Sequence, residues 1–71
     1  MSFTEEQILD AKKRLMEKKD SSGKPLMYCA LCEFESGDTK MFFSNDLHQL
    51  RSEVKSGKYN VVYVKYFKRE E

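Results

Sequence analysis

Two apolar segments separated by a short polar sequence constrain this chain most strongly. LMYCALCEFE and KMFFS are rich in aromatic and aliphatic residues, and they flank the polar sequence SGDT. This pattern predicts a β-hairpin over about residues 26–44. A two-residue turn at its tip would pair opposite charges and apolar groups across the strands. The expected pairs are Glu35 with Lys40, Phe34 with Met41, and Cys32 with Phe43.

The sequence before the hairpin predicts a helix over about residues 4–19. Thr4 is a good N-cap because its hydroxyl can accept from the amide of Gln7, and Gln7 completes a capping box. Phe3 and Ile8 occupy the two positions of a hydrophobic staple. Apolar residues recur at helical spacing through Leu15, so one side of this helix should pack on a core.

A second helix is predicted over about residues 45–56. Ser44 or Asn45 would cap its start, and Gly57 is a natural stop. The following segment, YNVVYVKYFK, is dense in β-branched and aromatic residues and predicts a strand over about residues 59–68.

These elements predict one small α+β domain over residues 1–71, with the order α-β-β-α-β. A right-handed crossover through the second helix would lay the last strand parallel to the second strand. The simplest arrangement is a three-stranded mixed sheet of order 2-1-3 packed against two helices.

Side chains alternate between the two faces of a strand, so the strand residues can be sorted by parity. One set is wholly apolar or aromatic and should face the helices, whereas the other is largely apolar but contains Glu33 and Lys65. If both helices cover one face, the second set forms an exposed apolar patch, which is typical of an interaction site. The alternative is one helix on each face. The expected partner-binding residues are Leu31, Phe42, Val61, Tyr63, Lys65 and Phe67.

The sequence Cys29-Ala30-Leu31-Cys32 has the C-x-x-C spacing of metal and redox sites. In a regular strand, however, residues three apart point to opposite faces, and a structural zinc ion needs four ligands. His48 is the one histidine of the chain. We therefore expect buried strand residues at Cys29 and Cys32, no metal and no cofactor, and we keep a zinc-bridged homodimer as a minor alternative.

The last strand interleaves basic and aromatic residues, a pattern that can bind single-stranded nucleic acid by stacking and phosphate contact. A net charge of +1 argues against a strongly basic nucleic-acid-binding protein, so this hypothesis ranks second. The residues that would carry it are Arg51, Lys58, Tyr63, Lys65, Lys68 and Arg69.

No pattern of nucleophile, base or phosphate-binding glycines indicates an enzyme. No apolar run approaches a membrane span, and two cysteines without an export signal favour the cytoplasm. The element order and small size resemble accessory proteins of bacteria and their phages. The sequence thus predicts a non-enzymatic regulatory protein that binds an unidentified protein partner through a sheet face or edge, with self-association as a homodimer included.

Overall fold

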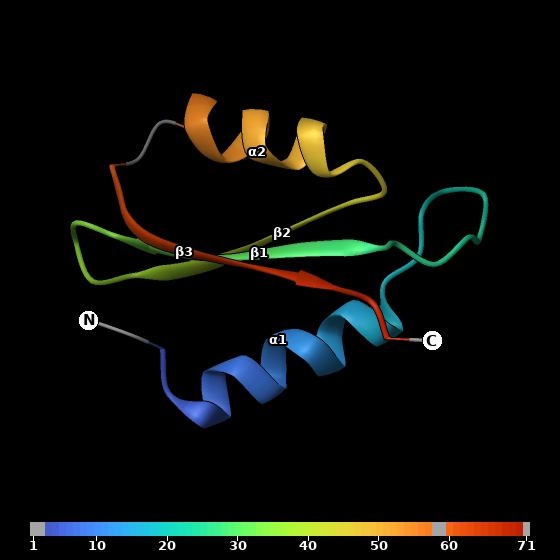
Figure 1. The fold of residues 1–71 in the computed structure, drawn as a ribbon, viewed down its shortest axis with the longest axis horizontal. Helices are drawn as coiled ribbons and strands as arrows, with labels where there is room; N and C mark the ends of the chain where they lie inside the picture. Colours follow the sequence, from blue (N-terminus) through green and yellow to red (C-terminus); the bar gives the residue numbers. More distant parts are fainter. Residues whose placement is uncertain (1–2, 58–59, 71) are drawn as a thin grey trace.

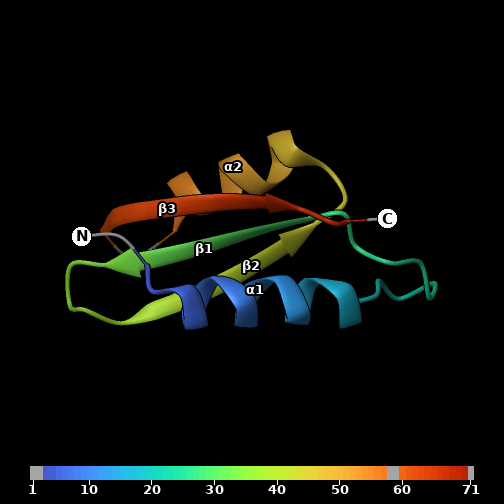
Figure 2. The same ribbon diagram turned by 60° about the horizontal axis from the view of Figure 1, so that its bottom comes forward.

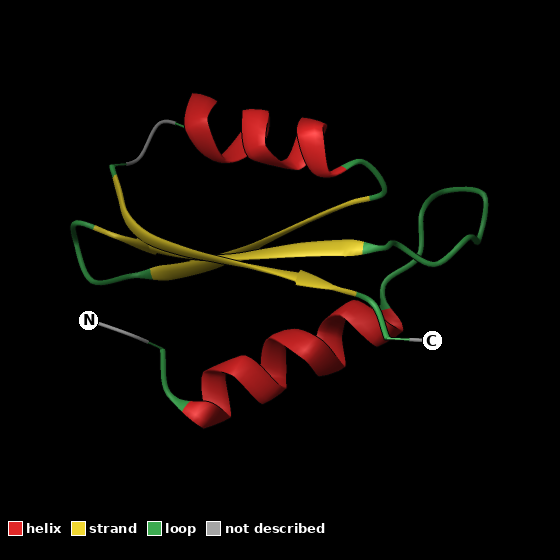
Figure 3. Ribbon diagram, in the orientation of Figure 1, coloured by secondary structure: helices red, strands yellow, loops and turns green. Residues whose placement is uncertain are grey.

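The computed structural model describes residues 3–57 and 60–70 of the chain. Lys58, and the predicted start of the last strand at residue 59, lie outside the described residues. Two helices lie on opposite sides of a three-stranded sheet (Figures 1 and 3). In chain order the elements are α1 (Glu5–Glu17), β1 (Tyr28–Phe34), β2 (Thr39–Ser44), α2 (Leu47–Ser56) and β3 (Val61–Lys68).

The sheet has the order β2-β1-β3, which confirms the predicted 2-1-3 order. The prediction of a mixed sheet is wrong, because β1 pairs antiparallel with both of its neighbours. The two outer strands do run in the same direction, since each is antiparallel to β1. They lie on opposite sides of β1, however, so they never become hydrogen-bonded neighbours. Helix α2 connects these outer strands across one face of the sheet (Figure 2).

The hairpin register differs from the predicted one by three residues. Cys32 pairs with Lys40 and Cys29 with Phe43, rather than Cys32 with Phe43. The amide of Gly37 donates to the Phe34 carbonyl at 2.9 Å, and the Phe34 amide donates to the Asp38 carbonyl at 2.9 Å. These bonds close a three-residue loop in which Gly37 has a φ of 93°, the left-handed conformation that glycine adopts without strain. Because the shift is odd, each β2 side chain lies on the face opposite to the predicted one.

A β-bulge also changes which side chains of β3 face the core. Phe34 pairs with Val61 and Glu33 pairs with Tyr63, so Val62 is an extra residue on β3. Val61 consequently packs on the same face as Phe34, whereas Val62 is left 59% exposed.

The sheet is covered on both faces, so of the two arrangements that the sequence left open, the structure has one helix on each face. The α1 core lies between the sheet and α1, and the α2 core lies between the sheet and α2 (Figure 1). Buried residues of the α1 core are Phe3, Ala11, Leu15, Cys29, Leu31 and Phe67. Those of the α2 core are Ala30, Cys32, Phe34, Leu50 and Val54. The physical reason is the sequence of β1, whose residues of both parities are apolar and need cover on both faces.

The helix ends follow the predicted signals in part. The Thr4 hydroxyl accepts from the Gln7 amide at 3.1 Å, and the Thr4 amide donates to Gln7 Oε1 at 2.9 Å, so the capping box is confirmed. Helix α2 is capped by Asp46, which accepts from the His48 amide at 2.9 Å, and not by Ser44 or Asn45. The hydroxyl of the buried Ser44 instead accepts from the Asp46 amide at 3.1 Å and so holds the cap in place.

The connection from α1 to β1 is organised around Asp20. Its Oδ1 atom accepts from the Ser22 hydroxyl at 2.6 Å and from the amides of Ser22 and Lys24 at 2.9 Å. The hydrogen bond from the Ser22 hydroxyl is the main reason why the pKa of Asp20 lies below its usual value. This loop lets the chain reverse from α1 into β1.

Candidate interaction surface at the sheet edges

The predicted partner-binding residues do not form one patch. Leu31 and Phe67 are buried in the α1 core. Phe42 and Val61 pack against the α2 core, on the other face of the sheet. The change in hairpin register places Phe42 on the α2 side of the sheet, away from Leu31 and Phe67. The bulge does the same for Val61. Of the six predicted residues, Tyr63 and Lys65 are exposed.

The two cysteines lie on opposite faces of β1, as the strand interpretation predicts. Cys29 belongs to the α1 core and Cys32 to the α2 core, and neither has exposed surface. Burial raises the pKa of each thiol to about 11, so both are protonated at neutral pH. His48 is exposed in the first turn of α2. Across residues 3–57 and 60–70, no three His, Cys, Asp or Glu side chains cluster in a way that could hold a metal ion.

Those residues of the nucleic-acid hypothesis that the structure describes are dispersed over the domain. Arg51 lies 5.5 Å from the Tyr66 ring centroid on the α2 side of the sheet. Tyr63 packs against Phe3 on the α1 side, with ring centroids 5.0 Å apart. Arg69 is engaged with α1 through a hydrogen bond to a helix carbonyl. The basic and aromatic side chains therefore do not share a single stacking face.

With both faces covered, the outer edges of β2 and β3 are where the sheet can be extended. The amide of Arg69 donates to the Met27 carbonyl at 2.6 Å, which continues the β1–β3 register beyond the end of β3. Hydrogen-bonded and non-hydrogen-bonded pairs alternate along an antiparallel ladder. Every second residue counted back from Arg69 is therefore bonded to β1, and the residues between them turn their N–H and C=O groups outward. These outward residues are Val64, Tyr66 and Lys68.

A groove runs beside the β3 edge, between this strand and α2. Its volume is about 420 Å³, and it is lined by Val54, Lys55, Asn60, Val61, Val64 and Tyr66. On the same strand, Val62 is 59% exposed, and Tyr63, on the α1 side of the sheet, is 37% exposed. The β3 edge thus combines outward backbone groups, a groove with both polar and apolar lining, and exposed apolar side chains.

The β2 edge has a different character, because it is lined by charged groups. A groove of about 430 Å³ between β2 and α1 is lined by Asp10, Arg14, Lys18, Thr39, Lys40, Met41 and Phe43. The ammonium groups of Lys18 and Lys40 lie 5.2 Å and 5.1 Å from the ring centroids of Phe43 and Phe42. Lysines at a strand edge disfavour pairing with another strand. β3 also carries lysines, Lys65 and Lys68, but it adds the exposed apolar side chains of Val62 and Tyr63, and for that reason it is the better candidate for contact with another chain.

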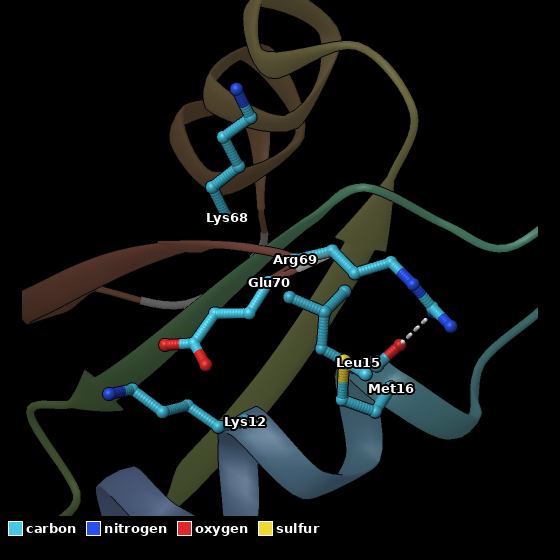
Figure 4. Close-up of a pocket in the computed structure, with 6 residues that line it drawn as sticks. All are labelled: Lys12, Leu15, Met16, Lys68, Arg69 and Glu70. Carbon is cyan, nitrogen blue, oxygen red and sulfur yellow. Dashed lines mark hydrogen bonds between the residues drawn. The ribbon is translucent and has the colours of Figure 1, made fainter.

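A small cavity lies where the end of β3 meets α1 (Figure 4). Its volume is about 30 Å³, and it is lined by Lys12, Leu15, Met16, Lys68, Arg69 and Glu70. Ligand pockets in proteins are on the order of 300 Å³ or larger, so this cavity is too small for a substrate or cofactor. The Arg69 guanidinium donates to the Leu15 carbonyl at 3.1 Å, which makes this a structural contact.

Comparisons of the chain with models of protein families, with curated proteins and with solved structures find no match. None of the helices formed by the described residues is both long enough and apolar enough to cross a membrane.

The β3 edge could have been found from the sequence as a candidate interaction surface. The predicted strand order already placed the last strand at an edge, and VVY at its start leaves apolar side chains there.

Proposed function

We propose that this protein is a small non-enzymatic binding protein that acts by protein–protein contact through the β3 edge. The observation that carries the proposal is the combination at Val64 and Tyr66. Both turn backbone hydrogen-bonding groups outward, and both line the groove beside α2. An extended segment of a partner could add to the sheet there, with backbone bonds supplying affinity and the groove supplying specificity.

The chemistry of the described residues supports binding rather than catalysis. The thiols of Cys29 and Cys32 are buried and protonated at neutral pH, so neither is poised as a nucleophile. The grooves at the two edges are open to solvent along the strands. We expect the protein to act in the cytoplasm, where reducing conditions keep both cysteines as thiols, and to serve there as a regulatory accessory factor.

Capture of partners on immobilised protein tests this proposal. Val62→Lys places a charge on the exposed side chain next to the groove, and edge lysines oppose strand addition. Thr39→Lys is the matched control, because Thr39 is an exposed residue of the β2 edge. We expect a specific set of proteins to be retained by the wild type and by Thr39→Lys, and to be lost with Val62→Lys.

Two results would contradict the proposal. The first is unchanged retention by Val62→Lys when circular dichroism shows that both variants are folded. The second is retention of the domain on single-stranded nucleic acid that weakens steeply with salt, because phosphate contacts have that signature. The second result would instead favour the nucleic-acid hypothesis.

A further inference from the structure

We infer that the β3 edge pairs with the β3 edge of a second copy of this chain, in an antiparallel register centred on Val64. This inference rests on the proposed binding at the β3 edge and names the partner. A two-fold axis through Val64 would join the two sheets into one continuous sheet. Both α2 helices would then lie on one face of that sheet and both α1 helices on the other.

The outward backbone groups limit the registers that such a dimer can adopt. Val64 and Tyr66 turn N–H and C=O outward, so the second strand must present matching groups opposite them. Two symmetric registers place Val64 opposite an outward residue and keep all but one end residue of β3 paired. One is centred on Val64, and the other is centred on Lys65.

The charge of Lys65 decides which of the two registers is more favourable. In the register centred on Lys65, this side chain would lie directly opposite its own copy, and like charges in that position are destabilising. In the register centred on Val64, Lys65 lies opposite Tyr63, and Val62 lies opposite Tyr66. Lysine opposite an aromatic ring and valine opposite tyrosine are favourable cross-strand pairs. The strand is therefore complementary to itself in the register centred on Val64.

The same register covers the apolar surface that the monomer exposes at this edge. Val64 and Tyr66 belong to the side chains that pack against the α2 core and line the groove. In the dimer, the equivalent side chains of the second copy would lie on the same face and extend over the groove. Val62, which is 59% exposed in the monomer, would pack against Tyr66 of the second copy.

Cysteine cross-linking tests the register directly, because the native thiols are buried and protonated. Directly opposite hydrogen-bonded residues have Cα atoms about 5.5 Å apart, within the range that a disulfide spans. Val64→Cys should therefore form a disulfide-linked dimer under mild oxidation. Lys65→Cys is the matched control, since its two copies would be diagonal neighbours roughly 7–8 Å apart, beyond the reach of a disulfide.

Sedimentation of the native chain tests the dimer independently. One strand edge is a small contact compared with the ~1,600 Å² of a stable complex, so the measurement should cover about 5–500 µM protein. We expect a concentration-dependent shift from monomer to dimer, with Val62→Lys weakening it at least tenfold and Thr39→Lys leaving it unchanged.

Three outcomes would overturn the inference. They are a wild-type monomer throughout the concentration range, cross-linking of Lys65→Cys in place of Val64→Cys, and a dimer lost with Thr39→Lys but kept with Val62→Lys. A monomeric wild type whose partner capture is still abolished by Val62→Lys would overturn the dimer alone. A wild type that neither dimerises nor captures another protein through the β3 edge would overturn the proposed function as well.

Discussion

The guanidinium of Arg69 donates a hydrogen bond of 3.1 Å to the backbone carbonyl of Leu15 (Figure 4). Leu15 lies in the last turn of α1, where the helix dipole favours a positive charge, and its carbonyl also accepts from the Lys18 amide at 3.3 Å. The amide of Arg69 also donates to the Met27 carbonyl at 2.6 Å. One residue thus ties the end of β3 both to α1 and to the chain that enters β1.

Arg69→Ala should destabilise the domain by about 1–2 kcal/mol, because it removes a charge-assisted hydrogen bond at a helix end. Urea unfolding measures this difference in the free energy of unfolding. Lys68→Ala is the matched control, since Lys68 is the exposed neighbour at the end of β3, and it should change stability by no more than about 0.5 kcal/mol. Equal stability of the two variants would show that the contact with Leu15 contributes nothing.

Thr4→Ala should destabilise the domain by about 1 kcal/mol through loss of the N-cap of α1. Gln7→Ala removes the reciprocal half of the capping box and should have a smaller effect, because the Thr4 hydroxyl can still accept from the backbone amide of residue 7. Thermal and urea unfolding of both variants give the comparison. A neutral Thr4→Ala would mean that the start of α1 does not contribute to the folded state.

The sequence predicts which segments form helices and strands, because the relevant signals are local. The capping box at Thr4, the stop at Gly57 and the polar loop of the hairpin each act within a few residues. The strand order also follows from connectivity, since the hairpin and the crossover leave few alternatives. These signals are enough for an outline of the fold.

The register of the hairpin could not be read from charge pairing alone. Glu35 opposite Lys40 looked favourable, but Gly37 provides a left-handed residue that closes a three-residue loop instead. The bulge at Val62 is likewise settled by packing against the rest of the domain. Each of these moves apolar side chains between faces, so the predicted residues do not share one sheet face, and the exposed apolar residues of β3 lie at the sheet edge.

The adjacent residues Phe42 and Phe43 provide a test of the two covered faces. Phe42 packs against the α2 core and Phe43 against the α1 core, so an aspartate at either position would be forced against apolar side chains. Phe42→Asp and Phe43→Asp should each destabilise by roughly 2–4 kcal/mol or unfold the domain. Val62→Asp is the control on an exposed apolar residue and should remain folded.

Circular dichroism and urea unfolding distinguish these variants. If both helices covered one face and left the other exposed, Phe42→Asp would be tolerated, whereas Phe43→Asp would unfold the protein. A stable Phe42→Asp would therefore show that α2 does not cover β2 in solution.

The buried thiols predict a loss of stability at alkaline pH. Burial raises the pKa of Cys29 and of Cys32 from 9.0 to about 11, so the folded state holds these protons more tightly than the unfolded chain. The resulting stabilisation is fully present below pH 9 and is lost as the pH rises from 9 towards 11.

Urea unfolding between these pH values should show a falling free energy of unfolding. The reference is the double variant Cys29→Ala with Cys32→Ala, which keeps every other titratable group. That variant should be less stable at neutral pH, because two buried side chains are truncated, but its stability should fall less steeply with pH. Identical slopes for the two proteins would show that the thiols are not buried as the structure has them.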